Sequence, residues 1–166
     1  RPSARKPASL TVGIAGFEKI QVLTRIDARH RRDPELSRHF LAEASSAFSL
    51  NHRNIVQVFE FGKLDGDLFV ATEFIAGVSL DRVLNHLRRQ RRLLPAALAC
   101  FLVSELVNGL EYAHRKSDAD GAALGLVHGR LTPSQVILSW EGSVKLSGFG
   151  LARAACLVQS REILEH

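Results

Sequence analysis

The stretch from Pro95 to His114 limits the possible folds of this chain more than any other segment. Proline is favoured at the first position of a helix. The residues behind it are apolar on nearly every side of such a helix, and such a helix needs neighbours on several sides. They are Ala97, Leu98, Cys100, Phe101, Leu102, Val103, Leu106, Val107 and Leu110. We therefore expect this helix to be buried. The longest apolar run, 93–103, is too short to cross a membrane.

Shorter patterns on both sides of this helix predict an α+β fold with antiparallel strands. Runs of β-branched and apolar residues indicate strands, and apolar residues at helical spacing behind Asp33 and Ser79 indicate capped helices. The connections between the strands are too short for parallel crossovers. The predicted strands are 21–26, 55–61, 68–74, 136–139 and 143–146, and the predicted helices are 33–50, 79–87 and 95–114.

Basic residues exceed acidic ones, by 22 to 17, and much of the excess lies in 25–32 and 88–92. Such clusters can bind nucleic acid or acidic lipid. No aromatic residues interleave these arginines as base stacking would require. We therefore expect a solvated helix face and loop, with no nucleic acid and no membrane as partner. A basic nucleic-acid-binding module that uses Arg88–Arg92 is kept as an alternative.

The ends of the chain and its cysteines carry little information on function. Residues 1–9 are basic and contain proline with no apolar core behind them, which indicates a disordered leader and no signal peptide. Cys100 and Cys156 lie far apart, so we expect no disulfide framework and a cytoplasmic location. Residues 154–166 are expected to form a C-terminal tail, with a short helix and the remnant of a purification tag.

Five segments, in order, resemble the protein kinase fold, with the nearest likeness to bacterial serine/threonine kinases of the eukaryotic-like type, such as those of myxobacteria. The segments are FLAEASSAFSLNHRNIVQVFEFG (40–62), LFVATEFIAGVSL (68–80), EYAHRK (111–116), VHGRLTPSQVIL (127–138) and VKLSGFGLA (144–152). The resemblance implies a small lobe of antiparallel strands with one helix over 10–76. It also implies an incomplete large lobe over 77–153, which carries a catalytic-loop hairpin.

The resemblance also implies where the catalytic groups should stand. The phosphate-holding lysine maps to Thr24, and its glutamate partner maps to Glu43. The histidine of the catalytic loop maps to His128, and the proton-accepting aspartate maps to Arg130. A threonine carries no charge for the phosphates, and a guanidinium cannot accept a proton.

The two positions implied to hold magnesium also differ from the family pattern. Gln135 stands where an asparagine is expected, and Gly148 stands where the metal-binding aspartate is expected. Magnesium prefers carboxylate oxygens. The segment from Val12 to Gly16 does not show the full glycine-rich loop that covers the phosphates. We therefore expect no metal, no cofactor and no ATP binding.

These substitutions predict a pseudokinase, which is not an enzyme and acts as a protein-interaction scaffold or regulator in bacterial signalling. A residual nucleotide-binding or atypical serine/threonine kinase is the alternative. The large lobe that would cover the 95–114 helix is incomplete, and large exposed apolar faces mark interfaces. We therefore expect a homodimer or a protein partner on Leu98, Phe101, Leu102 and Val103.

Overall fold

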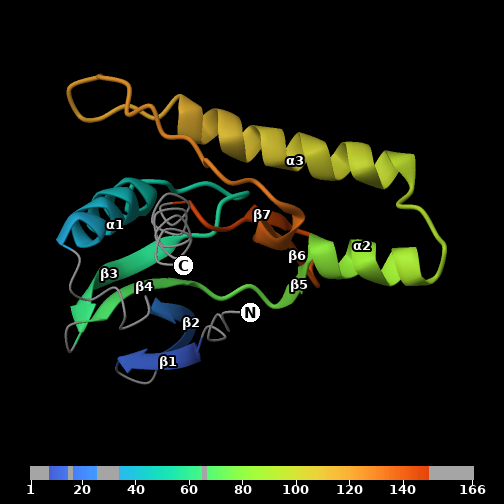
Figure 1. Cartoon of the computed structure of the whole chain (residues 1–166), viewed down its shortest axis with the longest axis horizontal. Coiled ribbons are helices and arrows are strands. Elements are labelled where there is room, and N and C mark those ends of the chain that lie inside the picture. The colour runs from blue at the N-terminus through green and yellow to red at the C-terminus, as the bar shows by residue number, and fades with distance from the viewer. Residues whose placement is uncertain (1–7, 15–16, 26–33, 65–66, 150–166) are drawn as a thin grey trace, which may run out of the picture.

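The structure is a computed structural model, and it describes residues 8–14, 17–25, 34–64 and 67–149. Two antiparallel sheets form its frame, as Figure 1 shows. The first sheet has four strands in the order β1-β2-β4-β3, and the second has three in the order β5-β6-β7. The predicted α+β class with antiparallel strands is confirmed.

The first sheet and one helix form the small lobe. Its strands are β1 (Ala8–Ile14), β2 (Phe17–Arg25), β3 (Val58–Leu64) and β4 (Asp67–Glu73). Helix α1 (Pro34–Phe48) packs along β3. Its residues Phe40, Ala44 and Ala47 are buried and recur at helical spacing, so they lie on the face toward the sheet. Val58, Leu68 and Val70 are the buried strand residues of the same core.

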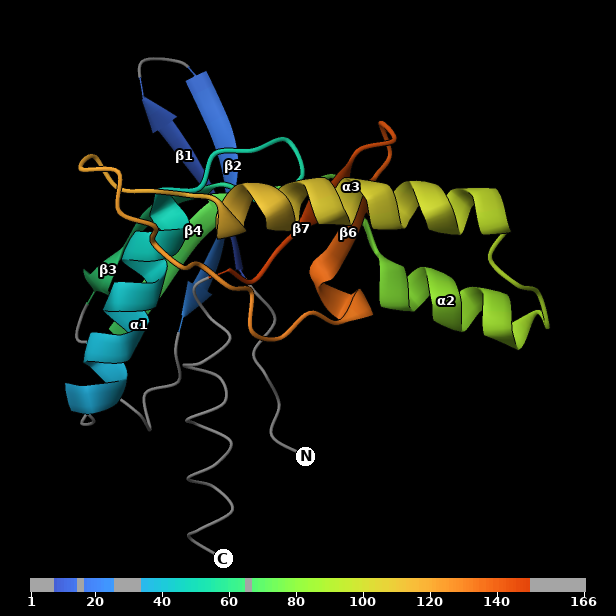
Figure 2. The same cartoon turned by 90° about the horizontal axis from the view of Figure 1, so that it is seen from above.

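The second sheet opens the large lobe. It contains β5 (Gly77–Ser79), β6 (Val136–Ser139) and β7 (Val144–Leu146), with a short 3₁₀ turn, η2 (Pro133–Gln135), before β6. Helices α2 (Leu80–Arg89) and α3 (Ala96–His114) lie between β5 and η2 in the chain. Figures 1 and 2 show both helices running out from the sheets toward the same end of the molecule.

The two lobes are joined where the loop after α1 meets β7. The Leu146 N–H donates to the Asn54 carbonyl at 2.8 Å, and the Val56 N–H donates to the Leu146 carbonyl at 2.9 Å. The Asn54 side chain donates to the Val144 carbonyl at 2.9 Å. Helix α3 closes on the same loop at Gly109, where an added Cβ would stand 3.2 Å from the Asn54 Cβ. The joint therefore consists of two backbone hydrogen bonds, one side-chain hydrogen bond and the close approach of α3 at Gly109.

Helix α3 is less buried than its composition predicts. Only Leu102, Gly109 and Ala113 are buried among its residues. Its packing within the described part of the chain comes mainly from β7, so the expectation of neighbours on several sides is wrong for these residues. By length and composition alone, α3 would also be long and apolar enough to cross a membrane, contrary to the sequence expectation. Core helices of soluble proteins meet the same two criteria.

Several boundaries differ from those expected. Strand β1 begins at Ala8, inside the expected leader, and it pairs along its whole length with β2, which starts four residues before its predicted position. Strand β5 has no signal of its own, because three residues are too few to show a period. Ser79 stands at the start of α2, but its side chain makes no capping hydrogen bond. Asp33 and the tail 154–166 lie outside the described residues.

The buried face of α1 gives a stability prediction. Phe40 is fully buried, and Phe40→Ala should lower the free energy of unfolding by about 3–5 kcal/mol, as large-to-small core changes do. Phe48→Ala is the matched control, because Phe48 lies on the same helix and is half exposed. It should cost clearly less. Chemical denaturation of both variants measures the difference, and equal costs would show that α1 does not pack on the sheet through Phe40.

Candidate functional site

His128 is a buried residue in the loop between α3 and η2. Its Nε2 lies 2.9 Å from the Ser147 carbonyl, and its Nδ1 accepts the Arg130 backbone N–H at 3.3 Å. The imidazole meets the Phe149 ring edge to face, with the centroids 4.8 Å apart. Burial lowers the pKa of His128 below its usual 6.5, and the hydrogen bond to Ser147 opposes this only in part. The neutral ring satisfies both contacts, since Nε2 donates while Nδ1 accepts.

The two positions that were expected to lack metal ligands lie together. The Ser147 N–H and hydroxyl both donate to the Gln135 carbonyl, at 2.8 and 3.0 Å. Gly148 follows in the left-handed region with φ +91°. A Cβ at Gly148 would stand 2.8 Å from the Gln135 Nε2, so the amide of Gln135 lies where a side chain at position 148 would begin.

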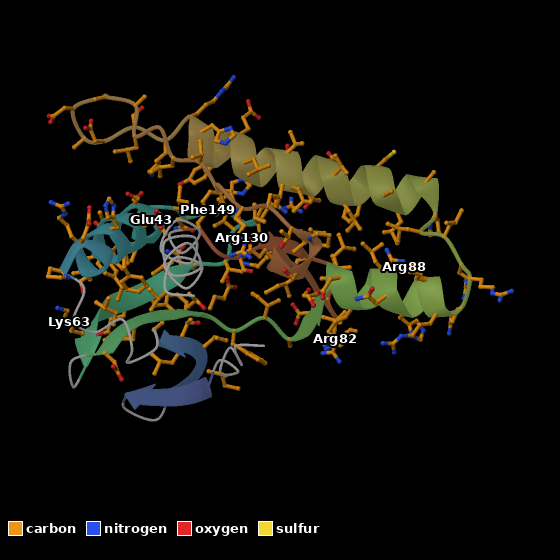
Figure 3. All side chains as sticks on the ribbon, in the orientation of Figure 1. Glu43, Lys63, Arg82, Arg88, Arg130 and Phe149 are labelled. Carbon is orange, nitrogen blue, oxygen red and sulfur yellow. The ribbon has the colours of Figure 1, made fainter. Side chains whose placement is uncertain are left out.

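The remaining site residues come from three separate elements. Thr24 lies in β2 opposite Val70 of β4 and is half-buried. Glu43 is half-buried on α1, and Arg130 is exposed in the loop between α3 and η2. In the view of Figure 3, Glu43 lies at α1, and Phe149 and Arg130 follow to its right. Lys63 lies at the far end of the small-lobe sheet in the same view. The segment from Val12 to Gly16, which lacks the full glycine-rich loop, is partly strand, because residues 12–14 belong to β1.

Residues 74–76, here called the hinge, connect β4 to β5 and are fixed at both ends. Before the hinge, the Lys145 Nζ of β7 contacts both carboxylate oxygens of Glu73, at 2.7 and 2.9 Å. After it, the Trp140 N–H donates to the Ala76 carbonyl at 3.0 Å. Between the two ties, no hydrogen bond joins the Ile75 N–H to any of the residues that the structure describes. The Ile75 N–H is therefore available as a backbone donor.

Two apolar side chains come from the sheets on either side of the hinge. Val22 of β2 pairs with Thr72, the residue two before the hinge. Ile137 of β6 pairs with Ser79, in the strand that follows the hinge. Both are half-buried. Val22 belongs to the small-lobe sheet and Ile137 to the β5-β6-β7 sheet, so the structure puts one of them in each lobe.

A pocket of about 580 Å³ lies at the joint of the lobes, and the Glu73–Lys145 ion pair that borders the hinge is part of its lining. The lining consists of Phe48, Asn51, His52, Arg53, Ile55, Gln57, Val58, Phe59, Glu73 and Lys145. None of the expected site residues is among them. Sequence reasoning missed this pocket, because nothing in the spacing indicates that Glu73 and Lys145, which are 72 positions apart, form an ion pair.

The expected interface on α3 is partly wrong. Leu98, Phe101 and Val103 are exposed by 44%, 45% and 57%. Leu102 is 4% exposed and belongs to the chain's own core, so it is not available to a partner. Helical geometry accounts for the difference, because neighbouring positions point to different sides. A partner on the three exposed residues stays a prediction.

Comparison with known proteins decides the family. The model of the protein kinase domain family matches residues 17–162. The tyrosine-protein kinase MasK of Myxococcus xanthus is 32% identical over 143 residues, 86% of this chain and 22% of that protein. The serine/threonine-protein kinase PknL of Mycobacterium bovis is 33% identical over 78% of this chain and 29% of its own length. This chain belongs to the protein kinase domain family.

The solved structures agree with this assignment. The kinase domain of Mycobacterium tuberculosis PknI aligns with a TM-score of 0.72 and 26% identity over 89% of this chain. The alignment covers 56% of the PknI chain, so this chain spans just over half of that kinase domain and less than a third of the curated relatives named above. The bacterial kinase resemblance is confirmed.

The expectation that this chain is not an enzyme is wrong. Its family is that of protein kinase domains, and its relatives are named protein kinases. Thr24, Arg130 and Gly148 predict loss of the reaction because they replace the lysine and the two aspartates of the family pattern. A substitution shows which group is missing from a position, whereas it does not show which other group takes its part. A scaffold role and a dimer stay predictions.

Gly77 gives a test of the hinge geometry. An added Cβ there would lie 2.8 Å from the Leu138 carbonyl carbon and from the Ser139 Cα, which are backbone atoms of β6. Backbone cannot rotate away, so Gly77→Ala should lower the free energy of unfolding by about 1–3 kcal/mol. Gly62→Ala is the matched control in β3, where the added Cβ meets only the Phe69 ring at 3.6 Å. It should be neutral or stabilising. Thermal unfolding of both variants would contradict the geometry if Gly77→Ala were equally harmless.

Proposed function

We propose that this chain binds an adenine nucleotide at its hinge, as part of an atypical bacterial protein kinase. The observation that carries the proposal is the Ile75 N–H, which has no hydrogen-bond partner in the described part of the chain although both of its flanks are fixed. A purine ring nitrogen can accept a hydrogen bond from such a backbone N–H. The family assignment supports the same ligand.

The apolar faces of a purine also find matching surface. Val22 and Ile137 are half-buried aliphatic side chains that come from the two sheets on either side of the hinge. A small-molecule site of this kind combines apolar walls with a few fixed polar groups. Because Lys145 and Trp140 hold the hinge against the β6–β7 hairpin, the walls and the donor keep one mutual arrangement before any ligand arrives. Less ordering is then needed on binding.

Magnesium does not fit the residues at the phosphate end. Protein kinases hold their magnesium ions on aspartate and asparagine side chains. Here Gly148 has no side chain, and the Gln135 amide occupies the space beside it. No group of three or more His, Cys, Asp or Glu side chains is placed to hold a metal within the described ranges. Magnesium is therefore given no part in the proposed binding.

Arg130 supplies positive charge in this region instead. Its side chain is exposed, while its backbone N–H is fixed on His128. A guanidinium stays charged at any relevant pH and can bind two phosphate oxygens at once. Phosphoryl transfer depends mainly on positioning and on charge neutralisation. We therefore propose that Arg130 binds the phosphates of the nucleotide. A hydroxyl group of a protein substrate would accept the phosphoryl group, in line with the named activities of the relatives.

The direct test is nucleotide binding without metal. ATP or ADP added in the presence of EDTA should raise the melting temperature, since a ligand at 100 times its Kd stabilises a protein by about 2.7 kcal/mol. Val22→Trp should abolish the rise by filling the purine space, and Ile137→Trp should do the same from the other lobe. Leu124→Trp, in the loop after α3, is the control and should keep it.

Two results would contradict the proposal. The first is an unchanged melting temperature with ATP, ADP and adenosine at millimolar concentration. The second is a rise that persists in both tryptophan variants, which would place the nucleotide away from the hinge. Circular dichroism of each variant distinguishes loss of binding from loss of the fold.

A further inference from the structure

The outer end of α2 and the loop after it carry a concentration of positive charge. We call residues 82–94 the arginine tip. Its exposed arginines are Arg82, Arg88, Arg89, Arg91 and Arg92. The sequence has no aspartate or glutamate from Arg82 to Ser104, so no acidic residue of this segment offsets them. No salt bridge to these arginines occurs among the residues that the structure describes.

Residues 82–89 of the arginine tip belong to α2, and a hydrogen-bonded turn follows them. The Arg91 N–H donates to the Arg88 carbonyl at 3.1 Å, and the Arg92 N–H donates to the Leu87 carbonyl at 2.9 Å. Arg91 adopts φ 54°, in the left-handed region where glycine is favoured. This conformation is less favourable for arginine than for glycine, because arginine has a Cβ atom. Arg91 places a positive charge at the turn.

An exposed leucine follows the arginines directly. Leu93 is 92% exposed. Single exposed leucines are common, but this one stands at the end of the molecule, next to two of the arginines. Figures 1 and 2 show that the α2–α3 connection lies at the far end from the small-lobe sheet. Figure 3 shows Arg88 toward the outer end of α2, whereas Arg82 lies near the start of the helix. A flat charged surface could therefore reach the tip without approaching the hinge.

In contrast to the sequence expectation of no membrane partner, we propose that the arginine tip docks on an anionic lipid bilayer, with its arginines at the headgroups and Leu93 inserted among them. Basic clusters gain about fivefold in affinity per arginine at such a surface. Amphipathic attachment adds the burial of apolar side chains at the headgroup boundary. Nucleic acid is the other polyanion to consider. It gives Leu93 no apolar layer to enter, and no aromatic side chain lies among the arginines for base stacking. The inference is independent of nucleotide binding.

Vesicle co-sedimentation of the chain tests the charge component. The chain should bind vesicles of phosphatidylcholine mixed with phosphatidylglycerol, bind phosphatidylcholine alone much more weakly, and dissociate as salt is added. Replacing Arg88, Arg89, Arg91 and Arg92 by glutamine should weaken binding by about 600-fold if all four lie at the surface, from about fivefold for each arginine. The matched control replaces Arg38, Arg53, Lys63 and Arg115, which are exposed elsewhere, and removes the same charge. It should have a clearly smaller effect.

The leucine component separates lipid from nucleic acid. Leu93→Ser should weaken vesicle binding by about tenfold, since it removes an apolar side chain from the lipid, whereas Leu124→Ser in the loop after α3 should not. Equal effects of the two arginine sets would overturn the proposal, and so would equal binding to neutral vesicles. If duplex DNA or single-stranded RNA binds more tightly than vesicles, and Leu93→Ser changes neither, the tip is a nucleic-acid surface and the lipid assignment is wrong.

Discussion

The backbone joint between β7 and the loop after α1 is the contact on which the rest of this structure depends. Asn54 and Val56 exchange hydrogen bonds with Leu146, and the Asn54 side chain reaches Val144. These groups are buried, so losing one partner would leave a desolvated donor or acceptor, which costs about 1–3 kcal/mol. The small-lobe sheet and the β5-β6-β7 sheet consequently keep one relative position. Helix α3 can approach this joint because residue 109 is a glycine.

The hinge takes its geometry from the same joint. Lys145 is the neighbour of both Val144 and Leu146 on β7, so the strand that is held by Asn54 also aims its amine at Glu73. A half-buried ion pair of this kind contributes little net stability after desolvation. Its effect here is orientation, because it fixes the chain at the point where β4 ends. His128 and Phe149 form the corresponding packed contact on the large-lobe side. The proposed nucleotide site thus rests on packing that is complete without a ligand.

Local sequence patterns predicted the helices well, but they did not predict the contacts between residues that are distant in the sequence. The periodicity of 33–50, 79–87 and 95–114 corresponds to α1, α2 and α3, and the β6–β7 hairpin was also expected. The β5 strand, the division into two sheets and the Glu73–Lys145 pair were not, since each depends on residues distant in sequence. Leu102 could not be told from Leu98 or Phe101, because composition does not say which side of a helix its neighbours occupy. The prediction that the chain is not an enzyme failed because it counted missing groups at motif positions.

Hydrogen exchange at the Ile75 amide tests the central claim most directly. In the free protein, no described residue accepts a hydrogen bond from this N–H, so it should exchange rapidly compared with the neighbouring β4 amides. Saturating ATP should slow the exchange of Ile75 and leave the loop 51–57, which lines the pocket at the joint, unchanged. Protection confined to 51–57, or no change at Ile75 under conditions where ATP raises the melting temperature, would contradict a nucleotide site at the hinge.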